Sequence, residues 1–168
     1  MSTLHVENLK GLSSGGNANK IIVPSGQTLH APGHIIQVVQ GETNTVYSSA
    51  TTSYGDTGLS ATITPTSTSS KILISLAQHY RFDRYGFSIK VLRGSTDVNS
   101  PAGRYMVYSQ SANDDLRGYH NYTLIDSPST TSATTYKTQA ALSASSGVNL
   151  QLNGNSFYSF LTLMEIAQ

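Results

Sequence analysis

Apolar and polar residues alternate along most of the chain after residue 40. In "KILISLAQHY" (71–80), Ile72, Ile74 and Leu76 fall on one side of an extended strand, while Leu73 and Ser75 fall on the other. "FSIKVLR" (87–93) alternates in the same way. This period of two predicts strands at about residues 45–52, 58–64, 71–80, 87–93, 105–109, 119–126, 134–143, 148–152 and 157–166.

Short polar segments rich in turn-forming residues separate these strands, for example "TPTSTSS" (64–70) and "SPSTTSAT" (127–134). Asn153-Gly154 stands between the last two strands and suits a type I′ turn, so the sequence predicts a hairpin there. Helical periodicity is nowhere sustained, and the density of serine, threonine and glycine disfavours long helices. The pattern predicts an all-β fold, an antiparallel β-sandwich of jelly-roll type.

The first 40 residues have a different character. "SSGG" (13–16) has the composition of a flexible joint, and "NKIIVPSGQTLHAPGHIIQVVQ" (19–40) holds two apolar runs separated by Pro-Ser-Gly and Ala-Pro-Gly turns. We expect an extended N-terminal attachment arm (1–18), a turn-rich oligomerising neck (19–40) and the C-terminal sandwich (41–168). The apolar residues predicted to pack in the neck are Ile21, Ile22, Val23, Leu29, Ile35 and Ile36.

Two arrangements would bury the neck residues. Proline cannot donate to a sheet ladder, so the two runs would pair poorly with each other within one chain. Left alone they would form an exposed apolar patch, which three copies around a threefold axis could cover. The alternative is an N-terminal strand that completes the edge of the sandwich.

Composition narrows the range of partners. Charged residues make up 11% of the chain and the net charge is +1, so there is no general electrostatic footprint for nucleic acid or an acidic membrane. No apolar run approaches the 18 residues of a membrane span, and the N-terminus lacks the apolar core of a signal peptide, so neither membrane insertion nor ordinary secretion is expected. Cysteine is absent, which excludes disulfides and cysteine zinc sites.

Catalysis and cofactor binding have little support in the sequence. A glycan-degrading enzyme needs paired carboxylates, and the loop aspartates that could meet are more simply solvated turn residues. There is no G-x-S-x-G elbow, P-loop or dinucleotide fingerprint, so we expect neither an enzyme nor a cofactor. The aspartates considered are Asp83, Asp97, Asp114, Asp115 and Asp126.

Metal binding is predicted to be absent. His30 and His34 flank Ala-Pro-Gly, and on a threefold axis each would occur three times, enough to ring a cation. The ordinary alternative is a solvent-facing or hydrogen-bonded turn histidine. These two histidines are therefore only weak candidates for ligands.

Ligand recognition is the stronger chemical hypothesis. "HYRFDRYGF" (79–87) interleaves aromatic residues with arginines and an aspartate, and "RGYHNY" (117–122) adds more tyrosine. Tyrosine and arginine are enriched in binding hot spots, although packing between subunits would use the same tyrosines. The predicted ligand-contact residues are Tyr80, Arg81, Asp83, Arg84, Tyr85 and Tyr119.

Three segments resemble small virion proteins of tailed bacteriophages, including phages of aquatic bacteria, of the kind labelled tail fibre or structural protein. The segments are "NANKIIVPSGQTLHAPGHIIQVVQ", "SYGDTGLSATITPTSTSSKILISLAQHY" and "NSFYSFLTLMEIAQ"; the resemblance is strongest over 56–74 and weakest over 81–135. It implies a virion protein, assembled in the cytoplasm of the bacterial host, that attaches through its N-terminal part. It also implies a trimeric C-terminal β-domain that projects outward.

Three functions from different classes follow. The first is a homotrimeric short tail-fibre-like module for host attachment, with a host surface glycan or protein as its ligand. The second is a capsid decoration or cement protein whose arm clamps capsid subunits. The third, a glycan depolymerase, is the remotest. In the first two, the partners are other copies of the chain and virion proteins that contact residues 1–40.

Overall fold

The computed structural model describes residues 10–11, 13–16, 18, 20–25, 27, 31–99, 106–110, 115–144, 149–154 and 156–168. The chain divides into two compact units, Met1–His30 and Ala31–Gln168. The described residues of the first unit contain turns but neither helix nor strand, and Ile21, Ile22 and Val23 are exposed there. The second unit carries all the regular structure described below.

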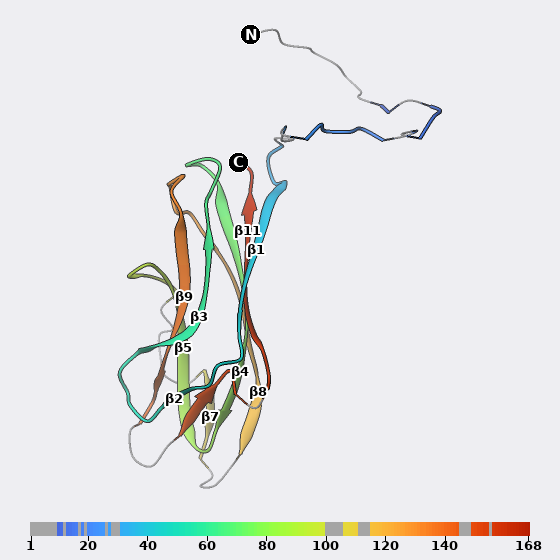
Figure 1. Ribbon diagram of the computed structural model, residues 1–168. Helices are drawn as coiled ribbons and strands as arrows, with labels where there is room; N and C mark the ends of the chain where they lie inside the picture. Colours follow the sequence, from blue (N-terminus) through green and yellow to red (C-terminus); the bar gives the residue numbers. More distant parts are fainter. Residues whose placement is uncertain are drawn as a thin grey trace. The chain divides into compact units, whose positions relative to one another are not determined.

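The second unit is an all-β sandwich of two antiparallel sheets that face each other (Figure 1), which confirms the predicted fold class. Sheet 1 contains β1 (Ile35–Thr43), β2 (Tyr47–Ser49), β4 (Lys71–Phe82), β8 (Leu116–Asp126), β10 (Leu150–Leu152) and β11 (Ser159–Ile166). Sheet 2 contains β3 (Gly55–Ile63), β5 (Tyr85–Arg93), β6 (Thr96–Asn99), β7 (Val107–Ser109) and β9 (Thr134–Leu142).

Each sheet has four strand positions, because some positions are filled by two short strands in succession. Across sheet 1 the order is β1 with β2, then β11 with β10, then β4, then β8. Across sheet 2 the order is β3, β9, β5, and then β6 with β7. The chain crosses between the sheets repeatedly, so residues far apart in sequence lie side by side.

The core follows the alternation read from the sequence. On β4, Ile72, Ile74 and Leu76 point into the sandwich and are almost fully buried. Phe87 on β5 and Tyr136 on β9 meet them from sheet 2. Each fully buried side chain of this size contributes roughly 1.5–3 kcal/mol to stability relative to an exposed one, so this interior is what holds the two sheets together.

The sandwich begins earlier than expected, so the predicted boundary at residue 40 is wrong. β1 pairs antiparallel with β11, which places Ile35 and Ile36 in the sheet rather than in a separate neck. Gly41 lets β1 approach β3 closely, since a Cβ atom there would lie 1.9 Å from the carbonyl oxygen of Ser60. Residues 35–40 thus form the edge strand of the alternative arrangement, and a neck can span residues 19–34 at most.

The hairpin predicted at Asn153-Gly154 is also wrong. β10 and β11 do not pair with each other; both run antiparallel to β4, one after the other along the same edge. Asn153 adopts the positive φ of 60° that the turn signal indicated. The turn serves a different purpose here, because the chain leaves the sheet at Asn153 and returns at Ser159 in the same direction.

A buried polar network holds Asn153 in place at the start of the loop between β10 and β11. The Asn153 side chain donates from Nδ2 to the carbonyl oxygen of Thr57 at 2.9 Å and accepts at Oδ1 from Gln78 Nε2 at 3.1 Å. Gln78 Nε2 also donates to Thr57 Oγ1 at 3.0 Å, and that hydroxyl lies 2.5 Å from the hydroxyl of Thr138. These hydrogen bonds connect sheet 1, sheet 2 and the start of the loop, and the groups that make them are buried.

Glu165 on β11 is a buried carboxylate. Thr66 donates to its Oε1 from the backbone nitrogen and from the hydroxyl, both at 2.7 Å, and Gln37 Nε2 donates to its Oε2 at 2.6 Å. Burial by itself would raise the pKa of Glu165, but the hydrogen bonds, first that from Gln37, outweigh it and lower the pKa below its ordinary value. Ionised Glu165 therefore joins β1 and the turn after β3 to β11.

We expect Glu165→Gln to destabilise the protein by about 1.5–3 kcal/mol near neutral pH, because a neutral amide is a weaker acceptor and cannot receive all three donors. The pKa of Glu165 is lower in the folded state than in the unfolded state. Its contribution is therefore fully present above the unfolded pKa and is lost as pH falls through the folded pKa. Urea unfolding at about pH 7 and at about pH 3 should show a gap between wild type and variant that narrows in acid.

The control for this experiment is Glu42→Gln, which removes an exposed glutamate from the neighbouring strand β1. It should change the free energy of unfolding by less than about 0.5 kcal/mol at either pH. An equal gap at both pH values for Glu165→Gln would show that the charge of this carboxylate does not stabilise the fold.

Candidate binding site

The outer faces of the two sheets differ in chemistry. On sheet 2, Lys137 forms an ion pair with Asp56 at 2.8 Å, and the hydroxyls of Thr62 and Thr135 are hydrogen-bonded to each other at 2.8 Å. Sheet 1 instead exposes large apolar side chains, since Val38 and Ile125 each keep more than half of their surface in solvent. Exposed apolar residues gathered on one face generally mark an interaction surface, so the outer face of sheet 1 is the candidate site.

Strand register sorts this face into rows that run across the strands, because directly opposed residues point to the same side of a sheet. The first row is apolar on all four strands and consists of Val38, Met164, Leu73 and Ile125. The next row is polar and consists of Gln40, Thr162, Ser75 and Thr123. The face therefore changes from apolar to polar along the strands.

Aromatic rings cover the part of the face around His79 on β4. Phe157 stacks on the His79 ring with centroids 4.6 Å apart, and Tyr119 on β8 meets the same ring edge-on at 5.5 Å. The Tyr119 hydroxyl donates to the carbonyl oxygen of Tyr158 at 3.0 Å. Tyr119, Phe157 and Tyr158 all remain more than two-fifths exposed, so their rings are open to a ligand.

His79 itself lies beneath these rings. It is almost fully buried, and its Nδ1 has no hydrogen-bond partner within the part of the chain that the structure describes. Burial lowers the pKa of His79 below its ordinary value, and the positive charge of Arg117 lowers it further. The imidazole is therefore neutral near neutral pH and supports Phe157 by packing.

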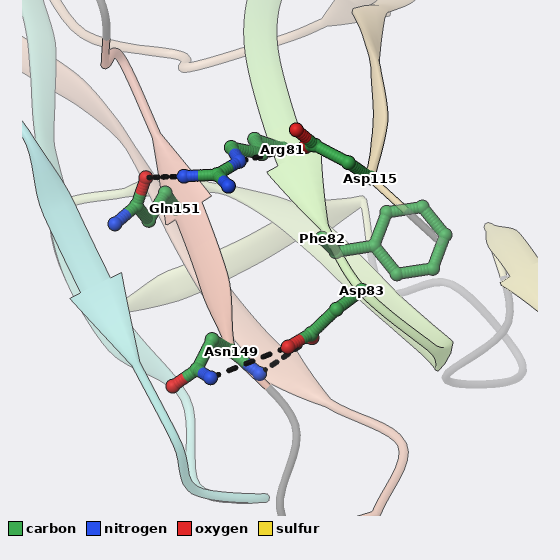
Figure 2. Close-up of a pocket in the computed structure, with 6 residues that line it drawn as sticks. All are labelled: Arg81, Phe82, Asp83, Asp115, Asn149 and Gln151. Carbon is green, nitrogen blue, oxygen red and sulfur yellow. Dashed lines mark hydrogen bonds and ion pairs between the residues drawn. The ribbon is translucent and has the colours of Figure 1, made fainter. Parts of the chain in front are cut away.

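A polar pocket of about 170 Å³ lies next to the aromatic residues, where β4 ends (Figure 2). Arg81 follows His79 by two residues and therefore points to the same outer face. Gln151 on β10 and Arg117 on β8 stand opposite Arg81 in register. The residues that line the pocket are Arg81, Phe82, Asp83, Asp115, Asn149 and Gln151.

Donors and acceptors alternate around the pocket wall. Arg81 donates from Nε to Asp115 Oδ1 at 2.7 Å and from Nη1 to Gln151 Oε1 at 3.4 Å. Asn149 donates to Asp83 from its backbone nitrogen at 2.8 Å and from Nδ2 at 3.3 Å. The wall of the pocket thus presents both hydrogen-bond donors and hydrogen-bond acceptors, held in place by these contacts.

Asp115 is shared by two arginines, which gives the pocket a local charge balance. Arg117 donates to it from Nε at 3.0 Å and also from Nη2, and Arg81 donates from the other side. These hydrogen bonds, those from Arg117 first, hold the pKa of the Asp115 carboxyl far below its usual range. A carboxyl that stays ionised in this way is unsuited to act as a general acid.

Three of the six predicted ligand-contact residues lie on this face. Arg81 and Asp83 line the pocket, and Tyr119 belongs to the adjoining aromatic group. The sequence pattern that suggested them, arginine and aspartate interleaved with aromatic residues, thus selects residues that share one face; that they contact a ligand stays a prediction.

The other three predicted residues are placed differently. Tyr80 and Tyr85 pack against the core, and the Tyr80 ring centroid lies 5.1 Å from that of Phe87. Tyr80 faces inward because side chains alternate along β4, so it cannot share a face with Arg81. The Arg84 guanidinium lies 5.4 Å from the centre of the Tyr85 ring.

Asn149, Gln151 and Phe157 belong to the candidate surface, and the sequence did not indicate them. Alternation within 148–152 could have assigned Gln151 to a polar face. The predicted hairpin paired this strand with the wrong neighbour, however, and so separated Gln151 from Arg81. The sequence predicts that Phe157 begins a strand. In the structure it precedes β11, and its ring stacks on that of His79.

Each aspartate considered for catalysis that the structure describes takes part in hydrogen bonds or ion pairs. Asp97 pairs with Lys90 at 2.9 Å. Asp126 accepts from Arg93 Nη1 at 2.5 Å and from the Tyr136 hydroxyl at 2.7 Å, which joins the end of β8 to sheet 2. Asp114 lies outside the described residues.

The remaining predicted residues concern metal binding and self-association. His34 is exposed just before β1, and its backbone accepts a hydrogen bond from Ala167, while His30 and Leu29 lie outside the described residues. Among the residues that the structure describes, no group of three or more histidines, aspartates or glutamates could hold a metal ion. The cation ring considered at His30 and His34 would need a trimer, so the described residues of one chain do not test these two weak candidates.

A scan against known protein families and a search of curated proteins each give no match to this sequence. Within the described ranges there is also no helix long and apolar enough to cross a membrane.

Proposed function

We propose that the protein is a structural component of a bacteriophage virion, a homotrimeric short tail-fibre-like module that uses its β-sandwich for adhesion to the host surface. One observation carries the adhesion part: the outer face of sheet 1 combines exposed apolar and aromatic side chains with a polar pocket. The outer face of sheet 2 instead carries ion pairs and a pair of threonine hydroxyls. A face of this kind suits binding, because large aromatic contact areas and fixed polar groups give both affinity and orientation.

The chemistry of the pocket favours binding over hydrolysis. A depolymerase needs one carboxyl that holds a proton near neutral pH. Asp115 is held in its ionised form by Arg117 and Arg81, and Asp83 is engaged by Asn149. These contacts support a pocket that holds a ligand without reacting with it.

Self-association is supported by the first unit. Ile21 and Ile22 are each more than half exposed, and Val23 is 41% exposed. Other copies of the chain could cover these residues, as the proposed trimer requires. The order of strand positions also supports the jelly-roll form of the sandwich, since the two four-position sheets interleave along the chain as two Greek keys do.

Light scattering of the intact chain and of residues 31–168 tests the oligomer. We expect the intact chain to have about three times its monomer mass of 17.9 kDa. The shortened chain should dissociate toward monomers, because it lacks the exposed apolar residues of the first unit. A monomer in both cases would contradict the trimer, and a trimer in both would place the contacts in the sandwich instead.

The capsid decoration alternative predicts a different location on the same particle. Antibodies against residues 31–168, coupled to gold, would be viewed on phage particles by electron microscopy. Gold at the tail would support the adhesion module, and gold over the capsid would support the decoration protein. Particles without any gold would contradict both.

A further inference from the structure

The aromatic group and the polar pocket form one continuous surface. Tyr119 stands opposite His79, and Arg117 stands opposite Arg81. The two pairs are separated by one repeat along β4, about 6.8 Å. A ligand longer than one small ring would therefore contact the aromatic rings and the pocket together.

The charges of this surface cancel locally. Asp115 lies between Arg81 and Arg117, and Asp83 supplies a second negative charge at the pocket. Two arginines and two aspartates leave no net charge to attract an ion. The surface therefore favours a neutral ligand over a phosphate or a carboxylate.

The polar groups that remain are suited to hydroxyls. Among the six residues drawn in Figure 2, no dashed line reaches the side-chain nitrogen of Gln151 or the side-chain oxygen of Asn149. One is a donor and the other an acceptor, and the two residues are two positions apart in the chain. A hydroxyl group can donate and accept at once, so different hydroxyls of one saccharide can pair with each of them.

We propose that this surface binds a neutral oligosaccharide, with one sugar ring stacked on Phe157 beside Tyr119 and the next held by hydroxyl contacts in the pocket. The cavity of about 170 Å³ suits part of a ligand, such as a single ring, rather than a whole drug-sized molecule. Phe157 lies with one face on His79, at 17° between the ring planes, so its other face can take the C–H groups of the first sugar. This inference names the ligand class of the proposed adhesion function and rests on it.

Glycan-array binding followed by saturation-transfer NMR tests the proposal. The probes are neutral oligosaccharides, such as maltotriose, cellotriose and mannotriose, compared with the acidic trigalacturonic acid. We expect binding to at least one neutral probe, and the dissociation constant should rise about tenfold or more in Tyr119→Ala and in Gln151→Ala. Binding to acidic probes alone, or to no saccharide on the array, would overturn the proposal.

Two further variants separate a binding effect from a folding effect. Tyr108→Ala removes a tyrosine of similar exposure from the outer face of sheet 2 and should leave saccharide binding unchanged. Tyr119→Phe keeps the ring but loses the hydrogen bond to Tyr158, and should retain most of the affinity. Equal losses in Tyr108→Ala and Tyr119→Ala would show that the site is not on sheet 1.

Adhesion to bacterial cells distinguishes this proposal from the broader function. If labelled protein adheres equally well with Tyr119→Ala or after periodate treatment of the cells, adhesion stands and the saccharide site fails. Adhesion that protease treatment of the cells abolishes would indicate a protein receptor and would also overturn the saccharide. If neutral sugars bind but the protein adheres to no cells, the site stands and the adhesion function fails.

Discussion

Replacing Gly41 by alanine should destabilise the sandwich by about 3 kcal/mol, near the upper end of the cost of overpacking. A Cβ atom at this position would lie 1.9 Å from the carbonyl oxygen of Ser60 and 2.7 Å from its carbonyl carbon. Both are backbone atoms of β3, which cannot rotate away as the end of a side chain could. β1 would have to shift from β3, and its pairing with β11 would weaken.

Urea unfolding of the intact chain measures this effect, with Gly16→Ala as the control. Gly16 belongs to the first unit, and a Cβ atom there would meet no atom within 4 Å. The control should therefore stay within about 0.5 kcal/mol of wild type. If Gly41→Ala were as harmless as the control, β1 would not be part of the sandwich, and the original boundary at residue 40 would be restored.

Replacing Asn153 by alanine should cost about 2–4 kcal/mol. The substitution leaves the Thr57 carbonyl without its donor and Gln78 Nε2 without one of its two acceptors, in a place that water does not reach. It also puts a residue with little tolerance for positive φ at φ 60°. The unfolding midpoint in urea should fall without a change in slope.

Two variants separate these causes. Asn153→Gly accepts the positive φ but still removes the hydrogen bonds, so it should recover only a part of the loss, about 1 kcal/mol. Ser129→Ala changes an exposed residue with a similar φ of 53° and should cost less than about 1 kcal/mol. If Asn153→Gly were as stable as wild type, the network would contribute nothing and backbone conformation alone would explain the loss.

The composition of the pocket explains why the site could be predicted only in part. The sequence predicts Arg81 and Asp83 together, because they are close in sequence and interleaved with aromatic residues, and both line the pocket. Asp115 was considered only as a catalytic candidate, since nothing in the sequence places it beside Arg81. The ion pair between them joins residues 34 positions apart, and it depends on β8 pairing with β4.

The sequence by itself determined the two-residue period of the strands, and with it the all-β class and the inward set on β4. This follows from local physics, because a strand with one buried face must alternate whatever its neighbours are. Most strand ends agree with the structure within a few residues, as at β4 and β9. β6 was missed since "TDVN" contains only one apolar residue to mark a face.

Only the tertiary structure decided which strands pair. The Asn153-Gly154 signal correctly indicates positive φ at Asn153, but β10 and β11 both pair with β4 and not with each other. In the same way, Val39 on β1 lies opposite Leu163 of β11 and packs against the core of the sandwich. Pairing depends on contacts between distant residues, and no local pattern specifies them.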